Sequence, residues 1–269
     1  MQRFLHLLVI LISFIFSGHS EAKNCLFSSK NIATVLDVKE NGILVLGDGR
    51  EVRLDAVLLP YPPPNMRQYK NWPLWQQTIA TLKKYVVQKT AHFHFSQRKT
   101  DRYGRLLAHV YVDGDSSTKI WIQEELIKNG LAWVFPFQTK AKCFPDLLPH
   151  EVLARKAKKG IWQHSMYQVL DAKKTYDMLH LTNRFHLVEG QVQNVAVVRG
   201  RAYLNFGKDW RTDFTIQIPK KALSQFQNHS IDIMALKDKC VRVRGWLIGL
   251  NGPMITTSHP SQIEQLPKC

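Results

Sequence analysis

Hydrophobic residues between positions 31 and 60 come in three short runs that are separated by turn residues. The runs are Ile32–Val38, Ile43–Leu46 and Glu51–Leu59. Their Val, Ile and Leu residues favour extended strands. The segments 40–42 and 47–49, which contain asparagine, aspartate and glycine, favour tight turns between these strands. The pattern predicts a three-stranded meander. The proline-rich stretch 60–64 ends it, because proline has no amide hydrogen to give to a β-ladder.

Helical spacing replaces strand spacing after the proline-rich stretch. Four apolar residues, Trp75, Ile79, Leu82 and Val86, recur at helical intervals, which predicts a helix that begins near Pro73. Two strands and then two helices are expected beyond it, at Ala91–Phe95, Leu106–Val112, Ile120–Lys128 and from near Pro149 to Trp162. The predicted order is therefore five strands interrupted by one helix, followed by two closing helices.

A second β-rich unit is predicted in the C-terminal third of the chain, at residues 183–269. The stretch before it, 167–182, has no strong pattern and is expected to be a linker with some helical character. The expected strands are His186–Val198, Ala202–Phe206, Phe214–Ile218, Val241–Ile248 and Met254–Thr257. Five strands in about 80 residues predict a small all-β barrel or sandwich.

The N-terminus has the three zones of a secretory signal peptide. A basic residue, Arg3, precedes an apolar stretch at 7–16 and small residues at 17–22, so we expect cleavage after Ala22 and a signal peptide at 1–22. An uncleaved membrane anchor is the alternative, but the apolar stretch of about ten residues is shorter than the ~20 needed to cross a bilayer. We therefore expect a secreted or periplasmic protein with no membrane span in the mature chain.

The chain is strongly basic, with 37 Lys and Arg against 21 Asp and Glu among its 269 residues and a formal charge of +16 at pH 7. Removal of the signal peptide would take away one base and one acid, so the charge is unchanged. The electric field of a protein with this positive charge attracts polyanions. Nucleic acid would be bound through its phosphates, and an anionic membrane surface or envelope polymer would be attracted in the same way. A basic protein that is merely soluble is the remaining explanation.

Four cysteines follow the predicted cleavage site, at positions 25, 143, 240 and 269. Because an exported protein matures in an oxidising compartment, we expect two disulfides. The spacing contains no Cys-x-x-Cys pair, so it does not indicate a zinc or redox motif. Three connectivities are possible. We favour Cys25–Cys143 with Cys240–Cys269, since each pair would then lie within one predicted domain.

Two short motifs in the first unit carry the clearest functional signal. Asp101-Arg102-Tyr103-Gly104-Arg105 stands just before a predicted strand, and Val52–Pro60 ends an earlier one. Both resemble motifs of the staphylococcal nuclease (thermonuclease-like) family, over about residues 31–162. The resemblance implies a fold that is mainly β with α, a five-stranded OB-like barrel with three helices, in a thermonuclease-like domain at 23–166. The segment 183–269 shows a weaker resemblance to an oligonucleotide-binding-like β domain.

In this family a calcium ion, a glutamate that activates water and two arginines act on the scissile phosphate. The resemblance implies that Arg53 and Arg105 are those arginines, since a guanidinium binds phosphate oxygens bidentately and stays charged. Arg102 and Tyr103 are expected to join them in binding nucleic acid. Gly104 permits the backbone turn that directs Arg105 inward. A structural alternative is that the two arginines only pair with acids at the same strand edges.

The acidic residues of the family are not matched in this chain. Gly42 stands at a calcium-ligand position, and Leu58–Leu59 stand at the family's Asp-Thr pair. Tyr61 stands at the position of the general-base glutamate, and a tyrosine with an ordinary pKa near 10 is a poor base at neutral pH. Glu40 and Asp55 are weak substitutes for the missing ligands, so no metal ligand is assigned. Calcium is expected only if the chain is an enzyme.

Three functions are compatible with these residues, and we favour the first. An exported pseudoenzyme would bind nucleic acid or another phosphate-bearing polyanion at the arginine pair, with catalysis impaired or lost. An active metal-dependent phosphodiester endonuclease would cut nucleic acid with calcium or magnesium. A structural envelope module would bind a protein partner through the proline-rich loop and the C-terminal domain.

Overall fold

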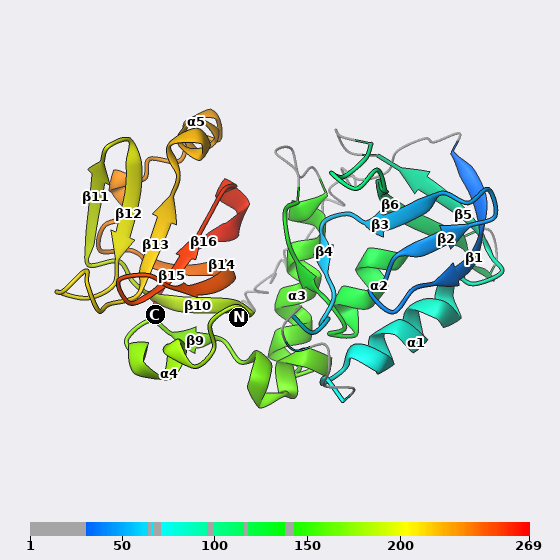
Figure 1. Ribbon diagram of the computed structural model, residues 1–269, viewed down its shortest axis with the longest axis horizontal. Helices are drawn as coiled ribbons and strands as arrows, with labels where there is room; N and C mark the ends of the chain where they lie inside the picture. Colours follow the sequence, from blue (N-terminus) through cyan, green and yellow to red (C-terminus); the bar gives the residue numbers. More distant parts are fainter. Residues whose placement is uncertain (1–30, 64–65, 67–70, 96–98, 116–117, 138–142) are drawn as a thin grey trace, which may run out of the picture.

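The computed structural model describes residues 31–63, 66, 71–95, 99–115, 118–137 and 143–269. The predicted signal peptide lies outside this part of the chain. Within it the polypeptide forms two lobes that lie side by side, an N-terminal lobe drawn in blue to green and a C-terminal lobe drawn in yellow to red (Figure 1). Both lobes consist mainly of β-strands with a few helices, as the sequence predicts.

Five strands of the N-terminal lobe close into a barrel. They are β1 (Ile32–Val38), β2 (Leu44–Leu46), β3 (Glu51–Leu54), β5 (Thr90–His94) and β6 (Leu106–Asp113). Neighbouring strands pair in the order β3-β2-β1-β5-β6, and a parallel ladder between β3 and β6 closes the circle. In that ladder Val52 faces Leu106 and Arg53 faces Leu107. The predicted meander and the predicted OB-like barrel are therefore confirmed.

Helices and short strands surround the barrel. They are α1 (Trp75–Val86), β7 (Lys119–Trp121), α2 (Ile122–Lys128), α3 (Phe144–Lys156), the 3-10 helices η3 (Gly160–Gln163) and η4 (Ser165–Tyr167), and a ladder of β4 (Val57–Leu58) with β8 (Trp133–Val134). The expected start of the third helix near Pro149 is wrong. Pro145 occupies the first turn of α3, where proline is favoured, and Pro149 lies inside the helix.

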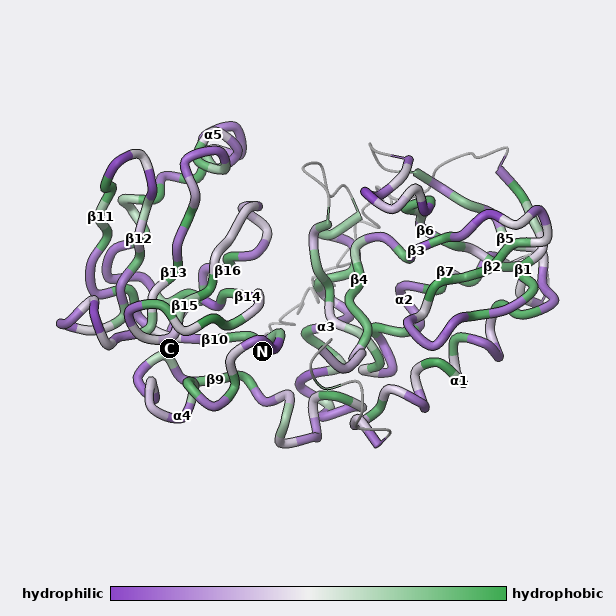
Figure 2. Tube along the Cα trace, viewed as in Figure 1, coloured by the Kyte–Doolittle hydropathy of each residue, from purple (hydrophilic) through white to green (hydrophobic). Residues whose placement is uncertain are grey.

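The barrel core is filled by apolar residues from alternating strand positions. Val35, Val52, Phe93 and Val110 each have 1% or less of their surface exposed, and Leu82 of α1 packs into the same cluster. Figure 2 shows hydrophobic stretches along the barrel strands and hydrophilic stretches at the turns. Burial of this apolar surface is the main force that holds the barrel together.

Eight strands build the sheet of the C-terminal lobe. They are β9 (Leu170–Asp171), β10 (Phe185–Gln191), β11 (Asn194–Val198), β12 (Arg201–Asn205), β13 (Thr215–Ile218), β14 (Cys240–Gly249), β15 (Pro253–Thr256) and β16 (Ile263–Leu266). Their order is β11-β12-β13-β15-β14-β10-β9, and β16 pairs with β14. The expected strands are present, with the first one divided into β10 and β11. Strand β16 and helix α5 (Lys220–Asn228) were not predicted, although Ala222 and Phe226 are spaced as on a helix face.

The segment 167–182, for which we expect a linker, belongs to the C-terminal lobe. It contains β9 and α4 (Thr175–Leu179). In the parallel ladder of β9 with β10, Leu170 faces Val188. Ala172 and Met178 are buried in the core of the same lobe together with Val188. The segment therefore contributes to that core and does more than connect two domains.

A disulfide joins Cys240, at the start of β14, to Cys269. This is the C-terminal pairing favoured from the sequence. Cys143 is also disulfide-bonded, and its expected partner, Cys25, lies outside the described residues. None of the helices in the described ranges is both long enough and apolar enough to cross a membrane.

The junction between the lobes contains a completely buried arginine, Arg244 of β14. Its Nη1 donates hydrogen bonds to the carbonyl oxygen of Val134 at 2.6 Å and to Oε1 of Glu151 at 3.1 Å. Its Nη2 lies 2.9 Å from Oε2 of Glu151 and also pairs with Glu264. Because Val134 and Glu151 belong to the N-terminal lobe, this ion-pair network joins the two lobes.

We expect the variant Arg244→Met to lose about 3–5 kcal/mol of unfolding free energy, because it removes the nearest cation from the buried Glu151 carboxylate and leaves the more distant Arg155, at 3.9 Å. Urea unfolding followed by circular dichroism would measure the loss. Arg50→Ala is the matched control, since Arg50 pairs with Asp48 while both side chains are 45% exposed. The control variant should lose less than about 1 kcal/mol of unfolding free energy. Equal losses in the two variants would contradict the structural role of Arg244.

Candidate functional site

The two candidate arginines lie on neighbouring strands of the barrel. Arg53 is part of β3, and Arg105 immediately precedes β6, whose first residue pairs with Val52. Both side chains line one cavity. Burial lowers the pKa of Arg53, and the positive charge of Arg105 lowers it further. The parallel pairing of β3 with β6 therefore builds the predicted arginine pair.

A tight turn fixes the position of Arg105. Gly104 has a φ of 77°, which glycine adopts without strain, and Oδ1 of Asp101 accepts the backbone N–H groups of Tyr103 and Arg105 at 2.9 and 3.1 Å. Oδ2 of Asp101 accepts a hydrogen bond from Nε of Arg105 at 2.7 Å. Burial opposes ionisation of Asp101, but these hydrogen bonds outweigh it and lower the pKa of the carboxyl group. The ionised carboxylate thus holds the guanidinium in place.

Aromatic rings accompany the arginines. The Cζ atom of Arg53 lies 4.0 Å from the ring centre of Phe137, a contact that was not predicted because the two residues are far apart in the sequence. The ring of Tyr103 is 65% exposed and has Arg102 and Arg105 at 4.8 and 4.9 Å. Arg102 also donates a hydrogen bond to the Tyr103 hydroxyl at 2.7 Å. The structure thus brings the four predicted nucleic-acid-binding residues to one region.

The cavity beside Arg53 and Arg105 has a volume of about 250 Å³. Its other lining residues are uncharged: Asn41, Gly42, Ile43, Leu54, Val57, Leu58, Leu59 and Tyr61. No carboxylate lines it in the part of the chain that the structure describes. Asp101, which does not line the cavity, pairs with Arg105 and offsets one of the two positive charges. The charge that remains beside the cavity is that of Arg53, which suits an anion. Among anions, phosphate matches the bidentate geometry of a guanidinium.

The side chains at this cavity do not fit a calcium ion, which requires several oxygen ligands. A Cβ atom built on Gly42 would lie only 2.2 Å from Cδ1 of Leu59, so leucine fills the space that a ligand side chain would need. Leu58, which we expect at the other position of the Asp-Thr pair, also lines the cavity. In the described ranges no three His, Cys, Asp or Glu side chains are grouped to hold a metal. No catalytic step is therefore derived through calcium.

Neither weak substitute, Glu40 or Asp55, lines the arginine cavity. Glu40 is exposed and borders a different hollow. Asp55 is 3% exposed; its Oδ1 accepts the N–H of Ala56 at 2.8 Å, and its Oδ2 lies 3.9 Å from Nε2 of His109. Burial lowers the pKa of His109 to about 4, although the charge of Asp55 opposes this, so the ring is neutral at pH 7. Asp55 therefore belongs to a buried polar contact.

Tyr61, which we expect at the general-base position, lines the cavity. Its ring packs edge-on against Trp75, with ring centres 5.3 Å apart. The amide of Tyr61 donates a hydrogen bond to the carbonyl oxygen of Leu59 at 2.7 Å. These contacts make Tyr61 part of an aromatic wall.

Comparison with known proteins agrees with this architecture. The family model of the staphylococcal nuclease homologues matches residues 62–164. Endonuclease YncB of Bacillus subtilis is 41% identical over 155 residues, which cover 56% of this chain and 70% of that protein. The SPbeta prophage-derived endonuclease YokF of the same species is 40% identical over 70 residues, 26% of this chain and 22% of YokF. The probable staphylococcal-like nuclease CAN1 of Oryza sativa subsp. japonica is 34% identical over 68 residues, 25% of this chain and 18% of CAN1.

A β-barrel with an arginine pair at the end of its parallel ladder defines a nuclease-like class of protein. The extent of the match to YncB shows that this chain belongs to the staphylococcal nuclease homologue family. The family model begins at residue 62. Arg105 therefore falls inside the matched region, whereas Arg53 and the residues at the expected calcium positions precede it.

We expect 10 mM calcium to leave the melting temperature of the protein within about 1 °C of its value in EDTA. A bound ion with a Kd of 0.1 mM would add about 2.7 kcal/mol of stability at that concentration and raise the melting temperature by several degrees. Differential scanning fluorimetry would show the difference, with magnesium as a parallel condition. A rise that disappears in Asp55→Asn would show that a metal site exists and that it uses this carboxylate.

Proposed function

We propose that this protein binds nucleic acid or another phosphate-bearing polyanion at Arg53 and Arg105, without calcium-dependent hydrolysis. The observation that carries the proposal is the cavity with two arginines and no carboxylate among its described lining residues. Two guanidinium groups at one site can hold a phosphate from two sides. The formal charge of +16 adds a long-range attraction for a polyanion.

The same cavity argues against hydrolysis by the family mechanism. Hydrolysis of a phosphodiester requires an activated water and stabilisation of the charge that grows in the transition state. Arg53 and Arg105 supply part of that stabilisation. The side chains of Leu58 and Leu59 supply no metal ligand, and no carboxylate that could act as a base lines the described part of the cavity. The site thus retains phosphate binding and lacks the groups that would activate water.

An active endonuclease is the second candidate function. The observation in its favour is the similarity to two proteins that are named as endonucleases, YncB and YokF. For YokF the similar region covers 22% of that protein. Nuclease activity in this chain would need carboxylates from outside the cavity described above, so we place this candidate second.

We also propose that the protein is exported. The pattern of the first 22 residues supports this, and so do the disulfide Cys240–Cys269 and the disulfide-bonded Cys143, because such bonds persist in oxidising compartments. N-terminal sequencing of protein from the periplasm or medium should give Lys23 as the first residue. Recovery of the full-length chain from the cytoplasm would refute export.

We expect the full mature protein to bind a labelled 20-nucleotide DNA or RNA with an affinity that falls steeply between 50 and 200 mM salt. The double variant Arg53→Ala/Arg105→Ala should bind more weakly, and the slope of log K against log salt should decrease by about 0.7–0.9 for each phosphate that is no longer neutralised. The affinity of Arg105→Lys should lie between those of the wild-type protein and the double variant. Lysine keeps the positive charge but loses the bidentate geometry of the guanidinium group. Fluorescence anisotropy would measure each affinity.

Arg211→Ala serves as the control for the binding experiment, because it removes an exposed arginine of the C-terminal lobe that does not line the cavity. A parallel digestion of plasmid DNA and of RNA with 10 mM calcium or magnesium should give no cleavage. Cleavage that depends on Arg105 would establish the second candidate function. Unchanged affinity in Arg53→Ala/Arg105→Ala would refute the first.

A further inference from the structure

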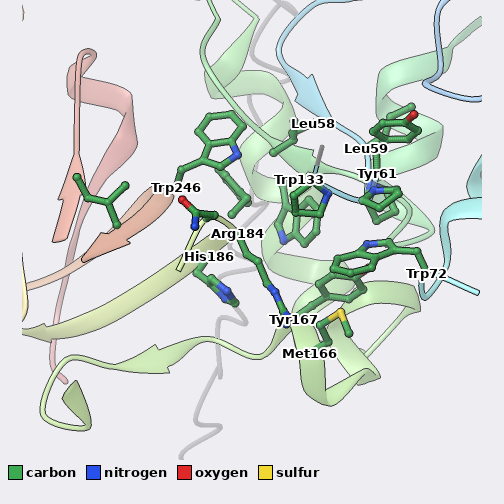
Figure 3. A pocket seen from close by; sticks show the side chains of 16 residues that line it. Leu58, Leu59, Tyr61, Trp72, Trp133, Met166, Tyr167, Arg184, His186 and Trp246 are labelled. Atoms are coloured by element: carbon green, nitrogen blue, oxygen red, sulfur yellow. The ribbon is translucent and has the colours of Figure 1, made fainter. Parts of the chain in front are cut away.

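A second cavity, of about 630 Å³, lies where the two lobes meet (Figure 3). Aromatic side chains form much of its wall: Tyr61, Trp72, Trp133, Tyr167, Phe185 and Trp246. Tyr61, Trp72 and Trp133 come from the N-terminal lobe, and Tyr167 ends the 3-10 helix η4 between the lobes. Phe185 lies on β10 and Trp246 on β14 of the C-terminal lobe. The cavity therefore forms only when the two lobes are docked. We call it the aromatic cavity.

One arginine extends into the aromatic cavity. Figure 3 shows the side chain of Arg184 reaching toward Trp72 and Tyr167, and its Cζ atom lies 5.6 Å from the ring centre of Trp72. Its Nε atom is buried and has no hydrogen-bond partner among the described residues. No Asp or Glu belongs to the described lining of this cavity. The aromatic cavity thus combines flat apolar faces with a positive charge that its own wall does not neutralise.

A buried histidine lies beside this arginine. His186 lines the cavity with only 3% of its surface exposed. Its ring makes no hydrogen bond of ideal geometry within the described ranges, and its one near partner is the backbone of Leu181. Burial and the charge of Arg184 lower the pKa of His186 to about 4, against a smaller opposing effect of the Leu181 backbone. At pH 7 the neutral ring offers one donor and one acceptor. A buried polar group normally has a hydrogen-bond partner, so the ring nitrogen that does not face the Leu181 backbone is available to a ligand.

The aromatic cavity and the arginine cavity share part of their wall. Leu58, Leu59 and Tyr61 line both of them. A chain molecule that places a phosphate on Arg53 and Arg105 therefore has the aromatic cavity next to it. The ring of Tyr61 stands at the boundary.

We infer that the aromatic cavity takes an unstacked nucleobase, so that the polyanion bound by this protein is single-stranded nucleic acid. The inference rests on the proposed function, because the same strand would be held by its phosphate at the arginine cavity. Tryptophan and tyrosine rings stack on bases of any sequence. Arg184 disfavours a cationic ligand and can donate hydrogen bonds to a carbonyl edge of the base, and the ring of His186 adds a further polar group for the base. The volume of the aromatic cavity lies within the range of ordinary ligand pockets.

Duplex nucleic acid does not fit this mode of binding. A paired base can enter the aromatic cavity only after it leaves the helical stack, which costs free energy that a single strand does not spend. The duplex can still meet the arginine cavity through its phosphates. The two forms of nucleic acid should therefore differ in affinity, and the difference should depend on residues of the aromatic cavity alone.

The test compares a labelled 12-nucleotide single strand with a duplex of the same sequence on the full mature protein at 100 mM salt. The wild-type protein should bind the single strand at least about tenfold more tightly than the duplex, because one good stacking contact has an effect of this size. Arg184→Met should remove most of this preference and leave duplex affinity within about twofold. Arg211→Met is the matched control, since Arg211 also lies over a tryptophan, 4.7 Å from the ring of Trp210, but does not line the cavity.

Two further measurements keep the result decisive if Arg184→Met does not fold. Trp246→Ala changes a side chain that is 43% exposed and should lower single-strand affinity in the same selective way. Tryptophan fluorescence of the wild-type protein should be quenched by a 5′-phosphorylated trinucleotide and unaffected by the duplex. Equal affinity for single strand and duplex, without quenching, would overturn the inference.

The failure of this inference can be separated from failure of the proposed function. If Arg53→Ala/Arg105→Ala weakens binding of both forms while Arg184→Met changes neither, the phosphate site is real and the aromatic cavity is not a base site. If Arg53→Ala/Arg105→Ala changes neither form, the proposed function itself is refuted. Loss of single-strand preference in Arg184→Met, with Arg211→Met unchanged, would support the inference.

Discussion

The buried ion pair of Arg244 with Glu151 is the constraint on which the arrangement of the lobes depends. A guanidinium without solvent exposure must be paired, because an unpaired buried charge is very costly. Glu264 of the same lobe pairs with it, and its other partners lie on α3 and on β8 of the N-terminal lobe, so docking of the lobes completes its pairing. Strand β8 in turn pairs with β4, where Leu58 faces Trp133. The same docking therefore positions the wall between the two cavities.

Phosphate binding and phosphate hydrolysis place different demands on this fold. Binding requires convergent positive charge, which the parallel pairing of β3 with β6 supplies through Arg53 and Arg105. Hydrolysis by the family mechanism also requires oxygen ligands for a metal and a base for water. In this chain Leu59 packs into the space beside Gly42. In the proposed function this apolar packing takes the place that metal ligands would need, and the barrel itself is unaffected.

The C-terminal lobe completes a surface that the barrel alone does not have. Arg184, His186 and Trp246 lie opposite Trp72 and Trp133 across the aromatic cavity. An arginine pair by itself binds phosphates of any polyanion, since phosphate contacts carry no information about bases. An adjacent aromatic cavity adds a means to distinguish unstacked from stacked bases. The second lobe therefore contributes selectivity in the proposed function.

The sequence by itself determined the features that depend on neighbouring residues. Alternation of apolar residues fixed the strands of the barrel, and the short motif around Gly104 located Arg105 and the turn that holds it. The contact of Arg53 with Phe137, the hydrogen bond from Arg244 to Val134, and the aromatic cavity were decided only by the tertiary structure. They join residues that lie far apart along the chain. Strand β16 likewise depends on its pairing with β14, because a short strand with partly exposed side chains is stabilised by its partner and leaves no strong local pattern.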